Sequence, residues 1–435
     1  MRELAVMKIR TLYLQNFRCF ESIKLELNKD YTVLVGINGA GKSTILDALS
    51  IALGGFLAGF DNVKSNSILQ TDAHCKAWEI GSRIDVQAQY PVVVEVEAQV
   101  GLGAHNIAWS RSLNGTGRRT TYGNTKSIAE YANALQQNIR NGEKCILPLV
   151  AYYGTGRLWM QKRNKTNNSV DKKMLNRQMG YLDCLDVASN DKQMLKWFEE
   201  MTYIQLQENR LVPELEAVNR ALSKCYKSSD SEIKDARFIY NVKKHELEIQ
   251  IYKTYGIEKL PVRMLSDGEK GIISLVADIA YRMALLNPDM LESVLDTPGV
   301  VLIDEIDMHL HPTWQKKIIN DLVTIFPCVQ FVFTTHSPSV LVNIPNQNIR
   351  VLDHHQLYVP QSKTYGRSVE EVLHEIMDVD VRPEDVTMLI NNFSSAVDSE
   401  DLAKAKKYLD QMRELLGNES REVIESQIAL DLAMI

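Results

Sequence analysis

Nine consecutive residues have the types and the spacing that suit the binding of phosphate groups. The segment Gly36-Ile-Asn-Gly-Ala-Gly-Lys-Ser-Thr44 fits the pattern G-x-x-x-x-G-K-[ST]. Glycines let consecutive backbone N–H groups curl around an anion, the lysine supplies positive charge to the outer phosphates, and the serine hydroxyl suits Mg²⁺. The alternative is a glycine-rich turn that arose by chance. We favour a loop that binds ATP and Mg²⁺ through Asn38, Gly39, Ala40, Gly41, Lys42, Ser43 and Thr44.

Two adjacent carboxylates follow an apolar stretch much later in the chain. In Gly299-Val-Val-Leu-Ile-Asp-Glu305, the apolar residues predict a buried strand that ends at the acids. Asp304 would hold Mg²⁺ through its water shell together with Ser43, and Glu305 would act as the general base that polarises the attacking water. The alternative is a turn or a helix cap, where paired acids also occur.

A third segment, Leu265-Ser-Asp-Gly-Glu269, has the features of a helix N-terminus. Ser266 is a natural N-cap, and Glu269 stands three residues later, which completes a capping box. A helix N-terminus with a hydroxyl and free N–H groups binds anions well, although a well-capped helix without a ligand is the alternative. The apolar run Val329–Thr335 predicts another buried strand, followed by His336; a lone histidine is structural in most proteins.

The elements that must position these residues are strands and helices in alternation. The apolar run Tyr31–Val35 precedes the glycine loop, and residues 44–53 follow it with helical spacing. Alternation of apolar and polar residues predicts antiparallel strands in other segments, namely 8–27, 83–89, 91–100, 106–112 and the hairpin 237–252. Helical spacing over 194–226 is broken by Pro213 into two helices. The sequence therefore predicts an α/β protein with an antiparallel lobe.

With Asn16-Phe-Arg-Cys-Phe20 ahead of the glycine loop, the set of motifs resembles the RecF/SMC/OLD branch of ABC-type ATPases. The resemblance implies an ABC-type P-loop ATPase head with an antiparallel β lobe, a short helical insertion, no long coiled coil, and a C-terminal helical tail. It also implies that Arg18 lies beside the bound nucleotide. His336 would be a catalytic residue that bonds the γ-phosphate and distinguishes ATP from ADP.

The same resemblance implies a homodimer formed around ATP. One subunit would bind the nucleotide through its glycine loop, and Ser266, Asp267 and Gly268 of the other subunit would hold the γ-phosphate. The segment Met308–Gln315 resembles the D-loop that packs across such a dimer. We favour this role over a metal site for His309 and His311, because no third ligand is near and Pro312 starts a helix.

The residues that should help to hold the metal and the attacking water, the Q-loop, are harder to place. Cys145–Tyr153 predicts a buried strand, and Tyr153–Arg157 follows it with two glycines. No glutamine stands at a convincing position, so this segment is either the Q-loop or a strand cap with equal weight.

Composition divides the chain into an ATPase domain, 1–366, and an acidic helical tail, 367–435, expected to dock an oligomer or a partner. The ATPase domain would contain a basic loop, 157–177, and a helical insertion, 186–230. The basic loop has seven basic residues and one acid, and the tail has sixteen acids and seven bases. Such a loop is able to contact DNA or RNA phosphates through charge, although a solvated loop is the default expectation.

The location of the protein is indicated by features that the sequence does not contain. No apolar run is long enough to span a membrane, and the N-terminus has no secretory h-region. The six cysteines include no C-x-x-C pair, which fits a reducing compartment and argues against zinc. We expect a cytoplasmic protein without a membrane partner.

A narrower resemblance links Asp304–Gln315 and the tail segment Thr364–Leu373 to the PtuA family of ATPases, from Septu and retron antiphage systems. It implies an ATP-driven switch, with a tendency to higher oligomers, that regulates a partner HNH nuclease like PtuB. The tail is too short for a nuclease domain of its own. The alternative is a RecF-like repair ATPase that binds DNA directly. A transporter subunit would need a membrane partner and a clear Q-loop glutamine, and the intact Asp304-Glu305 pair disfavours a scaffold without turnover.

Overall fold

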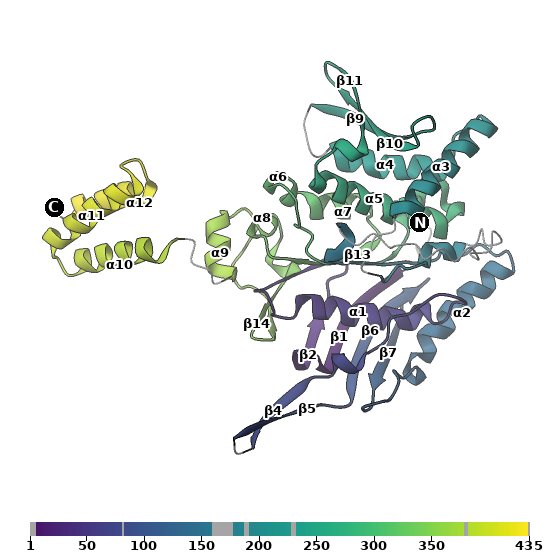
Figure 1. Cartoon of the computed structure of the whole chain (residues 1–435), viewed down its shortest axis with the longest axis horizontal. Helices are drawn as coiled ribbons and strands as arrows, with labels where there is room; N and C mark the ends of the chain where they lie inside the picture. Colours follow the sequence, from purple (N-terminus) through teal and green to yellow (C-terminus); the bar gives the residue numbers. More distant parts are fainter. Residues whose placement is uncertain are drawn as a thin grey trace. The chain divides into compact units, whose positions relative to one another are not determined.

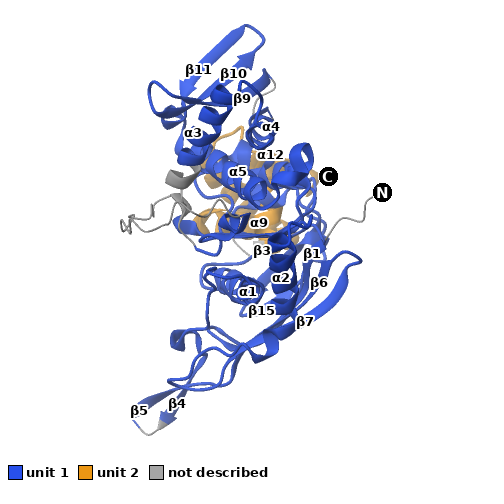
Figure 2. Cartoon of the chain, turned by 90° about the vertical axis from the view of Figure 1, so that its right-hand side faces the viewer, with its two compact units in different colours: residues 1–367 blue, residues 368–435 orange. Residues whose placement is uncertain are grey.

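The computed structural model describes residues 6–80, 82–158, 177–186, 191–227, 232–377 and 382–433. The chain divides into two compact units, Met1–Arg367 and Ser368–Ile435, which Figure 2 shows in separate colours. Each unit has its own buried core.

A six-stranded sheet forms the centre of the first unit, with strand order β15-β14-β3-β13-β12-β8. The strands are β3 (Tyr31–Val35), β8 (Leu149–Tyr153), β12 (Gly299–Ile303), β13 (Val329–Thr335), β14 (Ile349–Asp353) and β15 (Gln356–Tyr358). All of them run parallel except β15, which pairs with β14 at the edge in antiparallel fashion. Every residue of β8, β12 and β13 is buried, which explains why apolar residues predominate in them.

One face of this sheet is covered by α1 (Lys42–Leu57), which lies between the central sheet and a four-stranded antiparallel sheet (Figure 1). That second sheet has the order β2-β1-β6-β7, with β1 (Val6–Phe17), β2 (Phe20–Glu26), β6 (Val92–Gly101) and β7 (His105–Leu113), and α2 (Lys126–Arg140) packs beside it. Trp109 and Arg111 of β7 donate hydrogen bonds to the carbonyls of Ala52 and Ile51, at 2.9 and 2.8 Å. These bonds fix the lobe to the helix that follows the glycine loop.

The other face carries helices and a small sheet. The helices are α3 (Asp191–Glu208), α4 (Pro213–Lys227), α5 (Asp267–Leu286), α6 (Pro312–Gln315), α7 (Ile318–Ile325) and α8 (Pro338–Leu341). A three-stranded sheet of β9 (Ile233–Asn241), β10 (Glu246–Lys253) and β11 (Gly256–Pro261) packs on α4. The sequence predicted only the first two of these strands. Pro213 begins α4, so the predicted break between two helices is present.

The strand predicted over 145–153 is shorter than expected, because β8 begins at Leu149. Before it, the backbone N–H of Leu147 donates 2.8 Å to the side-chain oxygen of Asn287 instead of joining a neighbouring strand. The predicted strand over 83–89 is present as β5 (Arg83–Ala88), but its partner β4 (Cys75–Ile80) was not predicted. Together they form a two-stranded ribbon at one end of the first unit (Figures 1 and 2), with exposed Trp78, Ile84 and Val86.

The described part of the second unit contains four helices: α9 (Val369–Met377), α10 (Glu384–Asp398), α11 (Leu402–Leu416) and α12 (Arg421–Ala433). Phe393, Leu409, Met412 and Leu430 form the centre of the core shared by α10, α11 and α12. The apolar spacing within 369–376, 402–416 and 423–434 predicts helices that correspond to α9, α11 and α12. The sequence prediction missed α10, although Val386, Leu389, Ile390, Phe393 and Val397 have helical spacing.

These elements confirm the predicted α/β class with an antiparallel lobe, a short helical insertion and C-terminal helices. No helix within the described ranges has both the length and the apolar character needed to cross a membrane.

Candidate functional site

The glycine loop joins the end of β3 to the start of α1, as the sequence predicted. Gly39 and Gly41 adopt left-handed φ angles of 82° and 108°. A Cβ atom at Gly41 would lie 2.5 Å from Cζ of Phe20, so this position excludes every residue with a side chain. No side chain caps the first turn of α1, and Asn38, Gly39 and Ser43 are exposed. The loop therefore presents backbone N–H groups to solvent at a helix N-terminus, where an anion is favoured.

Lys42 is folded back over its own loop. Its Nζ donates to the carbonyl oxygens of Gly36 and Ile37 at 2.8 and 2.9 Å, and the residue is only 5% exposed. Burial lowers the pKa of this ammonium group, and the nearby carboxylates of Asp304, Glu305 and Asp307 oppose that shift. The fold thus brings the lysine of the glycine loop and the predicted catalytic acids into one electrostatic environment.

Thr334 holds both predicted acids in place. The hydroxyl of Thr334, on β13, donates 2.5 Å to a carboxylate oxygen of Asp304 and accepts 2.8 Å from the backbone N–H of Glu305. Asp304 is 5% exposed, and Glu305 adopts a left-handed φ of 45°. A left-handed non-glycine residue persists only where its surroundings hold it, and this feature is common at active sites. The Thr334 hydroxyl therefore stabilises the turn that follows β12 through two hydrogen bonds.

His336 lies near the same cluster. Burial and the positive charge of Lys42 lower its pKa, while the carboxylates of Glu305, Asp307 and Asp304 act in the opposite direction. The preceding residue, Thr335, donates 2.5 Å to the Asp307 carboxylate. The lowered pKa favours the neutral imidazole, one nitrogen of which is a hydrogen-bond donor.

The segment predicted as the Q-loop begins beside Asp304, because the backbone N–H of Asp304 donates 2.8 Å to the carbonyl of Tyr153. The Tyr153 hydroxyl donates 2.8 Å to Asp278, which also accepts 2.7 Å from Arg282. Burial raises the pKa of Tyr153 well above its ordinary value. The Tyr153 side chain therefore belongs to a buried polar network and is not available for a Q-loop role.

Arg18 lies in the turn between β1 and β2, which packs on the start of α1. Its guanidinium donates to the carboxylates of Asp72 and Asp47 at 2.8 and 2.5 Å. The neighbouring Cys19 forms a hydrogen bond with Thr44, and its sulfur would lie 2.9 Å from a Cβ atom at Gly41. The structure therefore places Arg18 next to the glycine loop, already paired with two acids.

The predicted signature segment forms the capping box at the start of α5. The Ser266 hydroxyl accepts 3.3 Å from the backbone N–H of Glu269, and the Ser266 backbone N–H donates 2.9 Å to the Glu269 carboxylate. A Cβ atom at Gly268 would lie 2.4 Å from the carbonyl oxygen of His309, so the signature and the D-loop-like segment touch. In the described ranges, no hydrogen bond or ion pair joins Ser266 to the glycine loop of the same chain.

Of the two histidines of the D-loop-like segment, His311 has a structural role. His311 caps α6, where its Nδ1 lies 3.1 Å from the Thr313 hydroxyl and accepts from the Thr313 backbone N–H. Across the described ranges, no group of three or more His, Cys, Asp or Glu residues is arranged to hold a metal ion.

Most of the basic loop, residues 159–176, lies outside the described residues. Arg177, at its end, donates to the carbonyls of Leu286 and Cys145 at 2.6 and 2.7 Å and to the Asn287 side chain at 3.1 Å. This half-buried arginine donates to groups of the protein itself, which was not predicted for a member of a phosphate-binding loop.

Several residues of the site were missed by sequence reasoning. They are Asp47, Asp72, Tyr152, Thr334 and His355, whose Nδ1 lies 3.3 Å from the carbonyl oxygen of Ala40. Asp47 had a usable signal, because it stands four residues after Ser43 on the same face of α1. The other four come from distant segments and carry no local signal.

Comparisons with known proteins give matches to an AAA domain family and to ATPases. The AAA_23 family, an AAA domain, matches residues 11–230. The retron Vc95 probable ATPase of Vibrio cholerae serotype O1 biovar El Tor is 27% identical, over 93% of this chain and 86% of that protein. The retron Ec83 probable ATPase of Escherichia coli is 27% identical, over 98% and 87%. The Septu protein PtuA of Bacillus thuringiensis is 23% identical, over 97% and 98%.

Among solved structures, the SMC head domain from Thermotoga maritima is 15% identical, with a TM-score of 0.46, over 82% of this chain and all of that chain. The sequence matches confirm the predicted resemblance to SMC- and RecF-like ATPases and to the ATPases of retron and Septu systems.

Proposed function

The chain belongs to the AAA_23 family of AAA domains, and from that premise we propose that it binds and hydrolyses ATP at the loop between β3 and α1. The observation that carries the proposal is the convergence of Lys42, Asp304 and Glu305, with both acids fixed by Thr334. Lys42 would exchange its two loop carbonyls for the outer phosphates. Glu305 would then polarise the attacking water as the general base.

The proposal is tested by ATP turnover and nucleotide binding in Glu305→Gln. We expect kcat to fall by about 10²–10⁴, the usual worth of a general base, while the affinity for ATP is retained. Asp30→Asn, which removes an exposed ion pair with Lys8, is the matched control. Turnover that survives in Glu305→Gln would contradict the assignment of the base.

We also propose Mg²⁺ as the metal. Ser43 and Asp304 supply a hydroxyl and a carboxylate, and Mg²⁺ prefers oxygen ligands of this kind together with water and phosphate oxygens. Bound Mg²⁺ would neutralise charge that develops on the phosphates. Turnover should stop when EDTA is in excess over the metal and return when Mg²⁺ is added back.

A homodimer around ATP completes the proposed site. Ser266, Asp267 and Gly268 would contact the γ-phosphate bound to the other subunit, which is supported by the exposed capping box and by the absence of a described bond to the chain's own loop. Ser266→Arg should leave the chain monomeric in Glu305→Gln with ATP, whereas Glu305→Gln alone should be trapped as a dimer in size-exclusion chromatography with light scattering. Dimers of equal abundance in both proteins would contradict the arrangement.

For the biological role, we propose a cytoplasmic ATPase switch in antiphage defence that regulates a partner HNH nuclease like PtuB. The support is the likeness over nearly the whole chain to two retron ATPases and to a Septu PtuA. Co-purification with the products of neighbouring genes, followed by sizing, tests the proposal. A nuclease in a complex larger than a dimer supports it. DNA without a protein partner would favour the RecF-like alternative, with the basic loop as the contact.

The second unit is our proposed docking surface for a partner or a further copy. Its last helix, α12, has apolar residues on two opposite faces: Val423 and Leu430 enter the core, whereas Ile424, Ile428 and Leu432 are exposed. A helix that is apolar on both faces is usually covered on both. Ile428→Asp should therefore release the partner or lower the oligomer without unfolding the unit.

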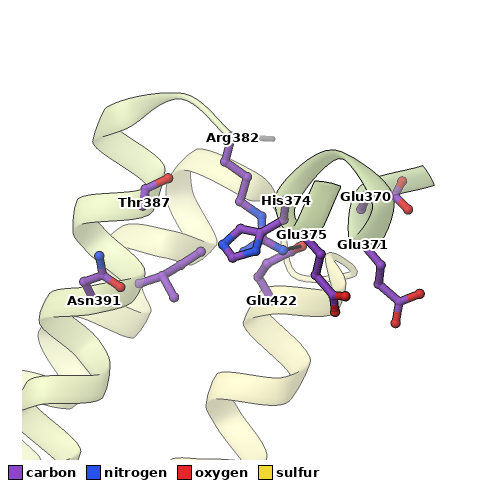
Figure 3. Close-up of a pocket in the computed structure, with 9 residues that line it drawn as sticks. Glu370, Glu371, His374, Glu375, Arg382, Thr387, Asn391 and Glu422 are labelled. Atoms are coloured by element: carbon purple, nitrogen blue, oxygen red, sulfur yellow. Dashed lines mark hydrogen bonds and ion pairs between the residues drawn. The ribbon is translucent and has the colours of Figure 1, made fainter. Parts of the chain in front are cut away.

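A cavity of about 620 Å³ lies between α9, α10 and α12 in this unit, and charged side chains line it. In Figure 3, His374, Arg382 and Glu422 converge, and Arg382 donates 2.6 Å to Glu422. Glu371 and Glu375 point away from them. Such an acidic rim would favour a basic partner.

A further inference from the structure

Backbone hydrogen bonds alone fix the turn that holds Arg18, independently of its side chain. Arg18 has a left-handed φ of 49°. Its backbone N–H donates 2.7 Å to the carbonyl of Asp72, and its own carbonyl lies 2.7 Å from Nδ1 of His74. A left-handed residue with both backbone groups bonded has little freedom, so the guanidinium starts from a defined point beside Gly41.

Two carboxylates then direct the guanidinium. Asp72, almost fully buried, accepts from Nε at 2.8 Å, and Asp47 accepts from one terminal nitrogen at 2.5 Å. Arginine has five N–H donors in a planar fork, so two fixed acceptors determine the plane of the group and leave donors directed elsewhere. The Arg18 side chain is 35% exposed, so the group is not sealed inside the protein.

Asp47 is itself held from the central sheet. Its second oxygen accepts 2.9 Å from the hydroxyl of Tyr152 on β8, which pairs with β12, the strand that precedes Asp304. Asp47 stands one helical turn after Ser43 on α1. It therefore links the helix of the glycine loop, the central sheet and the Arg18 turn.

The balance of charge argues against a simple anion trap. One guanidinium between two carboxylates gives a net charge of −1, which would not by itself attract a triphosphate. The arrangement instead fixes the direction of a cation, as preorganised sites do. We propose that Asp47, held by Tyr152, is a positioning residue that directs Arg18 toward a nucleotide bound at the glycine loop.

This inference rests on the proposed nucleotide site and is tested by the binding of a fluorescent ATP analogue, mant-ATP, with Mg²⁺ to the full chain. Asp47→Asn keeps an acceptor for Tyr152 but removes the charge that holds Arg18. We expect the Kd to rise by about tenfold, the worth of one charge-assisted hydrogen bond. KM should rise with it while kcat is unchanged, because Glu305 is not affected.

A double-mutant cycle separates positioning from a structural role. Arg18→Ala should weaken binding to a similar extent, and Asp47→Asn should add nothing in the Arg18→Ala background. Additive losses, or a Kd for Asp47→Asn equal to that of wild type, would overturn the inference. Asp61→Asn, which removes an exposed carboxylate from Arg140, is the matched control. If Asp47→Asn does not fold, the Kd of Tyr152→Phe is an independent test. An unchanged Kd in Tyr152→Phe would also count against the positioning of Arg18 by Asp47.

Lys42→Ala distinguishes the two levels of the proposal. If wild type binds mant-ATP, Lys42→Ala abolishes binding and Asp47→Asn has no effect, only the role of Asp47 fails. If wild type does not bind, or Lys42→Ala binds as wild type does, the nucleotide site fails and the positioning role fails with it.

Discussion

The glycine-loop region and the signature region of the same chain differ in the burial of their functional side chains and in the hydrogen bonds that these side chains form. Around the loop, Lys42, Asp304 and Thr334 are buried; Lys42 donates to the carbonyls of its own loop, and Thr334 donates to Asp304. At the signature, Ser266 is exposed, and its bonds go to Glu269 within its own capping box. The first region is assembled by folding alone, and the second is in the state expected of a surface that acquires its ligand from another molecule.

Two glycines give the sharpest test of this difference. Gly41→Ala places a Cβ 2.5 Å from the Phe20 ring, and Gly268→Ala places one 2.4 Å from the His309 carbonyl. We expect Gly41→Ala to weaken ATP binding by the monomer at least 100-fold, about 3 kcal/mol, because the loop cannot close around phosphate. Gly268→Ala should leave this binding intact and abolish the ATP-dependent dimer. Calorimetry measures ATP binding, and light scattering measures the dimer. If both variants lose ATP binding as monomers, the two regions do not differ in the way described.

Thr334→Val breaks the brace of the glycine-loop region. The buried Asp304 carboxylate and the Glu305 N–H each lose a partner at once. The free energy of unfolding should fall by about 1–3 kcal/mol, the usual cost of buried polar groups left unsatisfied, and kcat should fall with it. Urea unfolding and ATP turnover measure the change, with the exposed Thr116→Val as control. Wild-type stability in Thr334→Val would mean that the brace is not needed.

Ser266→Ala is the counterpart in the signature region. Loss of the N-cap should lower the free energy of unfolding by about 1 kcal/mol. Its effect on the dimer should exceed this stability cost, because the hydroxyl would also bond phosphate across the interface. Melting temperature without nucleotide and dimer affinity with ATP separate the two effects. A dimer affinity that falls only as far as stability does would confine Ser266 to capping.

The smallest predicted effect concerns pH. Burial and Lys42 hold the folded-state pKa of His336 below its ordinary 6.5. The unfolded chain therefore binds a proton more readily than the folded chain, so this histidine lowers stability as the pH falls below about 6.5 and contributes no slope above it. The melting temperature of His336→Gln should change less than that of wild type between pH 6.5 and 5. Parallel curves would indicate that His336 titrates normally.

The sequence predicted those parts of the fold and site that are local in the chain. The glycine loop, the β12 acids and the Ser266 capping box are contiguous motifs with a physical reason for each residue. By contrast, Asp72 meets Arg18 across 54 residues and Thr334 meets Asp304 across 30, so only the tertiary fold reveals these pairs. The strands β4 and β11 were missed because their apolar patterns are weak, and packing decides such segments. The helix α10 was missed although its apolar residues have helical spacing, so the sequence did carry a signal for it.

The ribbon of β4 and β5 has a consequence for exchange with solvent. Its strands pair only with each other, and an isolated two-stranded hairpin is at best marginally stable in water. Its amide protons should therefore exchange through a local opening that leaves the rest of the first unit folded. At its root, the His74 N–H donates 2.9 Å to the carbonyl of Asn16, beside Arg18. We therefore expect fast exchange in the ribbon and slow exchange at its base, and protection that extends outward from His74 would indicate that a molecule binds to the ribbon.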